Sequence, residues 1–182
     1  AYAGYISKKM GLPVRKIVIS SNKNDILTRF FNTGKMTIRK PLTSLSPSMD
    51  IQVSSNFERQ LFESSGRDSE TINNIFHEFS KNNSYRFDKR MQNDLQSSYL
   101  TTAVSNDETL NAIKQIKQKY NYLADPHTST GLHALLKKDA DLPWVSLACA
   151  HPAKFGDAIE KATGELPVLP KDLFKLFDKE EK

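Results

Sequence analysis

The sequence predicts an α/β protein, in which helices cover both faces of a mostly parallel sheet as a three-layer sandwich. The first 34 residues alternate between helix, strand and helix patterns, which is typical of a parallel sheet. Residues 143–149 form a nearly continuous apolar run, as a central parallel strand does. Helical periodicity over about 55–97 interrupts the alternation, and we interpret it as an inserted helical layer. We therefore expect one domain over 1–182.

The first elements follow from local signals. Apolar residues recur at helical spacing over 1–10, and Gly11 ends that helix. The β-branched run 15–20 predicts a short strand. A second helix is expected over 26–33, closing at Gly34 in the position where helices commonly end.

The middle of the chain is predicted to be mainly helical. Residues 35–45 have no clear period and are expected to form a loop or an irregular edge segment. Three amphipathic helices are expected over 55–65, 68–81 and 88–97. The run 99–104 has the composition of a strand, which restores the alternation.

Residues 106–177 are predicted to form four helices and one strand. A helix with a buried apolar stripe is predicted over 106–119, and another through 136 after Asp125-Pro126. The strand over 143–149 is followed by a helix over 155–163 and a terminal helix over 171–177. No internal repeat or long linker is found in the sequence.

Composition and charge bear on the partners and the cellular compartment of the protein. The net charge of +5 raises the alternative of a nucleic-acid-binding domain, but the basic residues are scattered among acidic ones, which favours a mixed solvated surface. No apolar stretch is long enough for a membrane helix, and the first residues show no signal-peptide pattern. A single cysteine, Cys149, suits a reducing compartment. We therefore expect a cytoplasmic protein without nucleic-acid or membrane partners.

Few residues stand out as carriers of chemistry. The spacing of the four histidines matches no zinc pattern, so no metal site is expected. Cys149 ends the predicted central strand, where it is either a buried small apolar residue or a group that points into a site. No base is positioned to make it a nucleophile. Asn24-Asp25 follows a strand and opens a helix, so the pair either caps that helix or faces a ligand.

Five strings in fixed order resemble the threonine synthase family. The three most distinctive are Ser46-Pro-Ser-Met-Asp-Ile-Gln-Val-Ser-Ser-Asn-Phe-Glu-Arg59, Asp125-Pro-His-Thr-Ser-Thr-Gly131 and Ala150-His-Pro-Ala-Lys-Phe155. The other two are Tyr2 to Pro13, and Asn22-Lys-Asn-Asp-Ile-Leu27. The resemblance runs along the whole chain and corresponds to the C-terminal portion of the family.

The resemblance implies a fold type II pyridoxal-phosphate enzyme that converts O-phosphohomoserine and water to threonine and phosphate. Such enzymes have two α/β domains with the cofactor in the cleft between them. The Schiff-base lysine and the phosphate loop of the family precede the portion that this chain resembles. No catalytic residue is therefore expected in this chain, which we expect to be inactive alone and to need the N-terminal half as a partner.

The resemblance also implies roles for individual residues. Cys149 stands where the family has a threonine that contacts the pyridine nitrogen of the cofactor, and Ala148 stands where the family has a serine. A thiol is a weaker donor than a hydroxyl, so the contact is expected to be looser or shared with Ser146 or water. Asn24 and Asp25 are expected on the substrate side. The alternative is a catalytically inactive truncated domain with a structural or partner-binding role.

Overall fold

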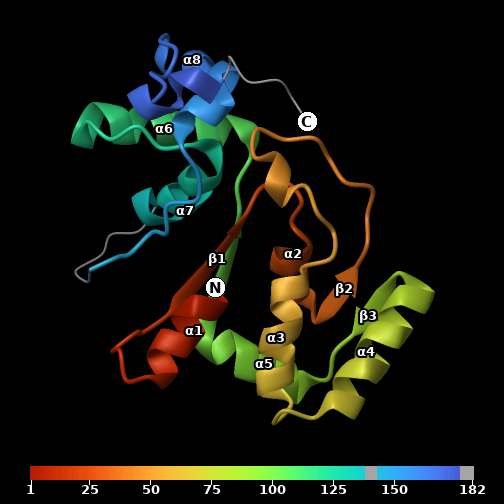
Figure 1. Ribbon diagram of the computed structural model, residues 1–182. Coiled ribbons are helices and arrows are strands. Elements are labelled where there is room, and N and C mark those ends of the chain that lie inside the picture. Colours follow the sequence, from red (N-terminus) through yellow and green to blue (C-terminus); the bar gives the residue numbers. More distant parts are fainter. Residues whose placement is uncertain (138–142, 177–182) are drawn as a thin grey trace. The chain divides into compact units, whose positions relative to one another are not determined.

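The computed structural model describes residues 1–137 and 143–176 (Figure 1). The chain divides into two compact units, residues 1–105 and 106–182, and each is described by itself. The single domain over 1–182 therefore stays a prediction.

Unit 1 contains most of the secondary structure. Its helices are α1 (Tyr2–Lys9), α2 (Ile26–Thr33), α3 (Ser55–Ser64), α4 (Ser69–Asn82) and α5 (Lys89–Ser98), with a short 3₁₀ turn, η1, at Pro47–Met49. Its strands are β1 (Ile17–Ser21), β2 (Lys35–Thr37), β3 (Ser84–Arg86) and β4 (Tyr99–Ala103). The predicted helical block is thus confirmed as α3, α4 and α5, with the short strand β3 inside it.

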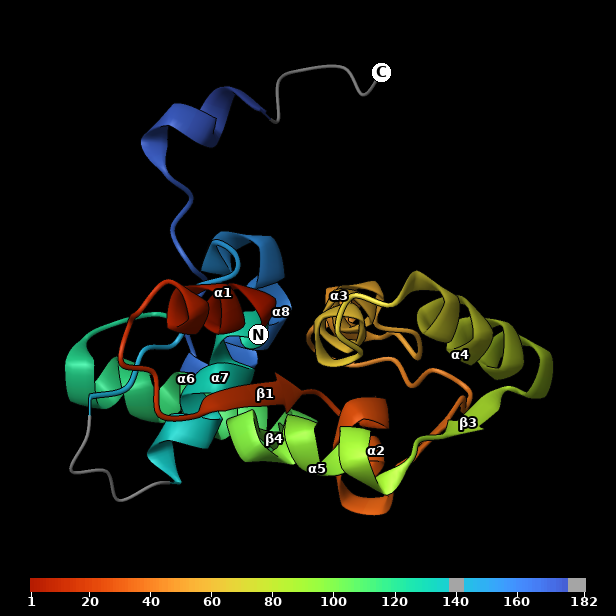
Figure 2. The same cartoon turned by 90° about the horizontal axis from the view of Figure 1, so that it is seen from below.

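The sheets of unit 1 are small. β1 pairs with β4 in parallel, from Ile17 opposite Tyr99 to Ser21 opposite Ala103. Both strands lie where the sequence predicts them, and their parallel pairing confirms the mixed α/β class. β2 and β3 form a second, antiparallel pair that the sequence did not predict; Figure 2 shows α4 beside β3. The three-layer sandwich and the fold type II arrangement stay predictions.

The core of unit 1 is aromatic. Phe30 of α2 is fully buried, and its ring centroid lies 5.5 Å from that of Phe57 and 4.6 Å from that of Phe87. Phe31 reaches Tyr99 of β4 at 6.2 Å. Two consecutive phenylalanines on α2 thus fasten that helix to α3, to the segment after β3 and to the parallel strands.

Helix α2 ends as its sequence predicts. Gly34 has a φ of 71°, in the left-handed region that glycine adopts without strain. A Cβ at this position would also lie 2.6 Å from Oε1 of Gln92 on α5. The backbone conformation therefore favours glycine, whereas the close contact involves only the end of the flexible Gln92 side chain.

Unit 2 is built on α6 (Asn106–Tyr120), which lies between α7 (Pro126–Leu136) and α8 (Gly156–Thr163) in Figure 1. Ile113 and Ile116 of α6 and Ile159 of α8 are buried, which confirms the predicted apolar stripe of α6. A 3₁₀ turn, η2 (Pro152–Phe155), leads into α8, and another, η3 (Lys171–Leu176), follows it. The predicted end of the terminal helix, Phe177, lies outside the described residues.

The predicted central strand over 143–149 is wrong. The segment is irregular, and no described strand pairs with it. Val145 is 85% exposed and Leu147 is 63% exposed, whereas Trp144 and Ser146 are half-buried. An apolar run indicates that a segment can be buried between layers, but a strand also needs a neighbouring strand to supply its hydrogen bonds.

Candidate functional site

Asp125 is the centre of the polar cluster in unit 2. The residue is 1% exposed and stands at the N-cap of α7. Its Oδ1 accepts from the backbone N–H groups of His127 at 2.9 Å and Thr128 at 3.4 Å. Its Oδ2 accepts from the Thr128 hydroxyl and, at 3.2 Å, from the backbone N–H of Ala150. One carboxylate therefore joins the start of α7 to a segment 25 residues further along the chain.

Thr128 extends this connection by one residue. Its Oγ1 accepts from the backbone N–H of Cys149 at 2.8 Å while its own proton is donated to Asp125. The N–H groups of Cys149 and Ala150 are thus both held from α7. The second and third distinctive strings of the sequence meet at this point.

His127 adds an aromatic contact to the cluster. Its Nδ1 lies 3.1 Å from Oδ1 of Asp125, and because a carboxylate only accepts, Nδ1 carries the proton. The imidazole centroid lies 4.8 Å from that of Phe155 in η2. Asp125 orients the ring, and the ring packs on the turn that follows Cys149.

Gly131 allows the segment before Cys149 to approach α7. A Cβ on Gly131 would lie 2.7 Å from Oγ of Ser146, closer than a side chain tolerates. The chain around Cys149 is therefore fixed on α7 by two backbone hydrogen bonds and one close packing contact.

The Cys149 side chain is exposed, and its Sγ lies 3.6 Å from the carbonyl oxygen of Leu147. Its pKa is raised, first because burial of the sulfur disfavours the thiolate and second because the Asp125 carboxylate repels it. The thiol is therefore neutral at physiological pH, where it can donate a hydrogen bond.

The other predicted site residues lie in unit 1. Nδ2 of Asn24 donates to the Leu42 carbonyl at 2.8 Å and to Oδ1 of Asp50 at 3.0 Å. Its Oδ1 accepts from the Leu42 N–H at 2.8 Å and from Gln52 at 3.2 Å. Asn24 is 4% exposed, so its amide anchors the long loop before α3.

Asp25 stands at the N-cap of α2, but its side chain makes no capping hydrogen bond. It is paired instead with Arg29, at 2.8 Å, and Arg29 donates to the Thr37 carbonyl. The structure thus shows what holds Asn24 and Asp25 in place, and their substrate-side role stays a prediction.

The first distinctive string contributes to the same polar network. Nδ2 of Asn22 donates to Oγ of Ser44 at 2.6 Å and to Oδ1 of Asp50 at 2.7 Å. Ser46 is 2% exposed and accepts from Asn22 at 3.1 Å. Ser46 and Asp50 of this string therefore accept from the buried amide of Asn22, together with Ser44, which lies just before the string.

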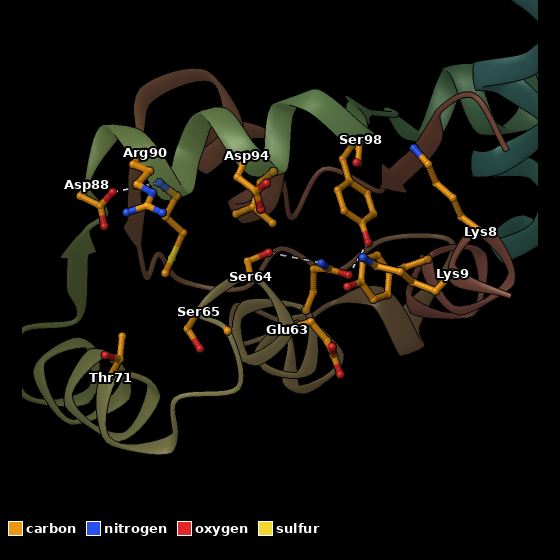
Figure 3. Close-up of a pocket in the computed structure, with 16 residues that line it drawn as sticks. Lys8, Lys9, Glu63, Ser64, Ser65, Thr71, Asp88, Arg90, Asp94 and Ser98 are labelled. Atoms are coloured by element: carbon orange, nitrogen blue, oxygen red, sulfur yellow. Dashed lines mark hydrogen bonds between the residues drawn. The ribbon is translucent and has the colours of Figure 1, made fainter. Parts of the chain in front are cut away.

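A separate cavity of about 860 Å³ lies in unit 1 (Figure 3). Lys8 and Lys9 of α1 lie at one end of it, and Asp88 and Arg90 lie at the other. Its lining mixes both signs of charge, and it contains none of the predicted site residues.

Within residues 1–137 and 143–176, no group of three or more histidine, cysteine, aspartate or glutamate side chains is placed to hold a metal ion. Over the same ranges, no helix has both the length and the apolar character needed to cross a membrane.

Comparison with known proteins identifies the family. The family description "Threonine synthase, C-terminal" matches residues 128–182. Threonine synthase of Pseudomonas aeruginosa is 37% identical over 184 residues, a match that covers 100% of this chain and 39% of the relative. That of Saccharomyces cerevisiae is 40% identical over 200 residues, covering 96% of this chain and 39% of the relative.

A solved structure gives the same result. The crystal structure of PLP-bound threonine synthase from Brucella melitensis matches with a TM-score of 0.92 and 39% identity, over 99% of this chain and 39% of that chain. The chain thus spans about two fifths of the length of its relatives. Its fold is that of the C-terminal portion of an α/β enzyme. The chain belongs to the threonine synthase family, as a C-terminal portion.

Sequence reasoning singled out Cys149 but missed the residues that hold it. Asp125 and Thr128 were seen as part of a distinctive string, without individual roles. An Asp-x-x-Thr pattern at the start of a helix is a capping signal. The Ala150 N–H, which donates to the Asp125 carboxylate, is 25 residues away in sequence, so no local pattern around Asp125 predicts this hydrogen bond.

Proposed function

We propose that this chain is the C-terminal part of a pyridoxal-phosphate-dependent threonine synthase, which converts O-phosphohomoserine and water to threonine and phosphate. The observation that carries the proposal is the thiol of Cys149, held on α7 through its backbone and exposed at the position where the family has a cofactor-contacting threonine. Family membership and the PLP-bound structural neighbour support it.

The residues of unit 2 fit the pyridine end of this cofactor. A pyridine nitrogen accepts a hydrogen bond, and the raised pKa of Cys149 keeps a proton on the sulfur to donate. Ser146, on the same segment, was the expected second donor, but its hydroxyl lies against Gly131 of α7, so Cys149 is the donor on which the proposal rests. When bound, the cofactor supplies carbanion stabilisation, while the protein binds and orients it.

The exposed segment 143–149 is proposed to contact the N-terminal half of the enzyme. Val145 and Leu147 present apolar side chains to solvent, and the segment has no strand partner among the described residues. We propose that it becomes the expected central strand when it pairs with the N-terminal half of the enzyme. The cofactor-binding lysine of the family would come from that half, so the isolated chain is inactive.

The experiment is a chimera in which this chain replaces the matched portion of the Pseudomonas aeruginosa enzyme. The expected result is phosphate release from O-phosphohomoserine, with Cys149→Thr at least as active and Cys149→Ala less active. A folded, cofactor-loaded chimera that releases no phosphate, even with Cys149→Thr, would support the inactive, partner-binding alternative, which the exposed Val145 and Leu147 also suit.

A further inference from the structure

We propose that Asp125 is the positioning residue of this site: its carboxylate, extended by the Thr128 hydroxyl, fixes the backbone of Cys149 and Ala150 and thereby sets where the thiol points. What the thiol contacts rests on the proposed function. The bridge itself rests only on the contacts within unit 2.

Many donors meet at the one buried carboxylate of Asp125. Besides the two N–H groups of α7, the Thr128 hydroxyl, the His127 ring and the Ala150 N–H all approach Asp125. A carboxylate accepts at about four lone-pair sites and donates none when ionised, so it suits a site surrounded by donors better than an amide of the same size, with the donors on Oδ1 sharing its lone pairs. An amide in its place would turn an NH₂ group toward other donors.

In the described part of unit 2, no strand gives the segment before Ala150 a regular structure. The residues from 143 to 149 belong to no strand, so no ladder of backbone hydrogen bonds fixes the direction of Cys149. Two hydrogen bonds to α7 fix the direction of the backbone instead. The Cys149 N–H donates to Thr128 Oγ1 at 2.8 Å, and the Ala150 N–H donates to Asp125 Oδ2 at 3.2 Å. The two N–H groups belong to the peptide units on either side of the Cys149 Cα, so holding both from one helix restrains the backbone at Cys149.

The turn that follows Ala150 is connected to Asp125 as well. His151 accepts at its Nδ1 from the Ala153 N–H at 3.1 Å, which starts η2, and Phe155 at the end of η2 packs on the His127 ring. Asp125 also holds that ring. The segment is thus anchored to the same carboxylate both directly, at Ala150, and indirectly, through Phe155.

Site-resolved amide hydrogen exchange on the intact chain tests the proposal. Asp125→Asn should speed exchange at Cys149 and Ala150 by at least about tenfold while α8 keeps its protection, because the lost contacts are local to the start of α7 and the segment that it holds. Asp68→Asn is the matched control, since Asp68 caps α4 with the same Asp-x-x-Thr spacing and has no bond to a distant segment. It should leave both amides unchanged.

A second pair of variants keeps the test decisive if Asp125→Asn fails to fold. Thr128→Val removes the hydroxyl and should speed exchange at Cys149, whereas Thr128→Ser keeps it and should restore the parent rate. Unchanged exchange at both amides in Asp125→Asn, or equal rates in the two Thr128 variants, would overturn the proposal and leave Asp125 as an ordinary helix cap. No step uses cofactor or substrate, so the proposed function fails separately, by a lack of phosphate release.

Discussion

Two helices of this protein begin with the same capping pattern and use it differently. Asp68 caps α4 by accepting from the N–H groups of Glu70 at 3.0 Å and Thr71 at 3.2 Å, and from the Thr71 hydroxyl at 2.6 Å. Asp125 caps α7 through the corresponding groups of His127 and Thr128. Asp68 is exposed, whereas Asp125 is buried and reaches Ala150.

The comparison shows that a local motif acquires a site-building role through its surroundings. At α4 the motif satisfies the N–H groups of one helix, with water as an alternative partner. At α7 water is excluded, so each donor around the carboxylate depends on it, and a remote segment joins them. The two aspartates should therefore differ most in how much stability the protein loses when each is removed.

The largest effect is expected from Asp125→Ala. The substitution leaves several buried donors without an acceptor, so the free energy of unfolding should fall by roughly 3–5 kcal/mol. Asp68→Ala should have a much smaller effect, because water replaces the exposed carboxylate. Urea unfolding of both variants measures the difference, and equal losses would mean that burial does not distinguish the two caps.

A third carboxylate, Asp50, extends the comparison to unit 1. Asn24→Ala should remove the partners of Leu42 and Gln52 and leave one face of Asp50 unfilled, at a cost of roughly 2–3 kcal/mol. Urea unfolding and limited proteolysis within 38–52 measure it. A stable variant with an intact loop would show that Asn24 is free for the predicted substrate-side role.

The packing contact beside Cys149 gives a smaller effect. Gly131→Ala should favour α7 by its helix propensity but push against Ser146, whose Oγ would lie 2.7 Å from the new Cβ. In a Ser146→Ala background the same change should be more favourable by roughly 1 kcal/mol. A double-mutant cycle by thermal unfolding measures this coupling, and additive changes would show that the segment does not press on α7.

The smallest effect concerns His133 in α7. Burial lowers the pKa of His133 most, and the nearby Lys137 lowers it further. Glu108 opposes this shift: its Oε1 lies 3.3 Å from Nε2 of His133, although the two atoms do not form a well-aligned hydrogen bond. Because the folded pKa is depressed, the stabilisation is present above about pH 6.5 and is lost as the pH falls through the folded value. His133→Gln should flatten this part of the stability profile; an unchanged slope between wild type and variant would exclude His133 as its source.

The sequence predicted those parts of the molecule that local signals specify. Helix α2 and its end at Gly34 match the expected range, because apolar spacing and a glycine fix both within a few residues. The strands β1 and β4 were likewise found from their β-branched and aromatic residues. The strands β2 and β3 have three residues each, too few for a period to be recognised.

The other failures are non-local. The apolar run 143–149 predicted a buried strand, but most of the segment is exposed, because its composition could not indicate whether a partner strand is present. Cys149 was expected at the end of that strand and instead ends an irregular, exposed segment. The role of Asp125 depends on Ala150, and no pattern within α7 predicts which distant N–H the carboxylate will meet.

The most direct test of the account is the pH dependence of Cys149 alkylation, followed by mass spectrometry in the parent chain, Asp125→Asn and Asp68→Asn. The pKa of the thiol is raised first by burial and second by the Asp125 carboxylate, so the profile of Asp125→Asn should shift to lower pH and alkylation at pH 7 should be faster. Asp68→Asn should follow the parent. Identical profiles for all three proteins would contradict the claim that Asp125 controls the thiol.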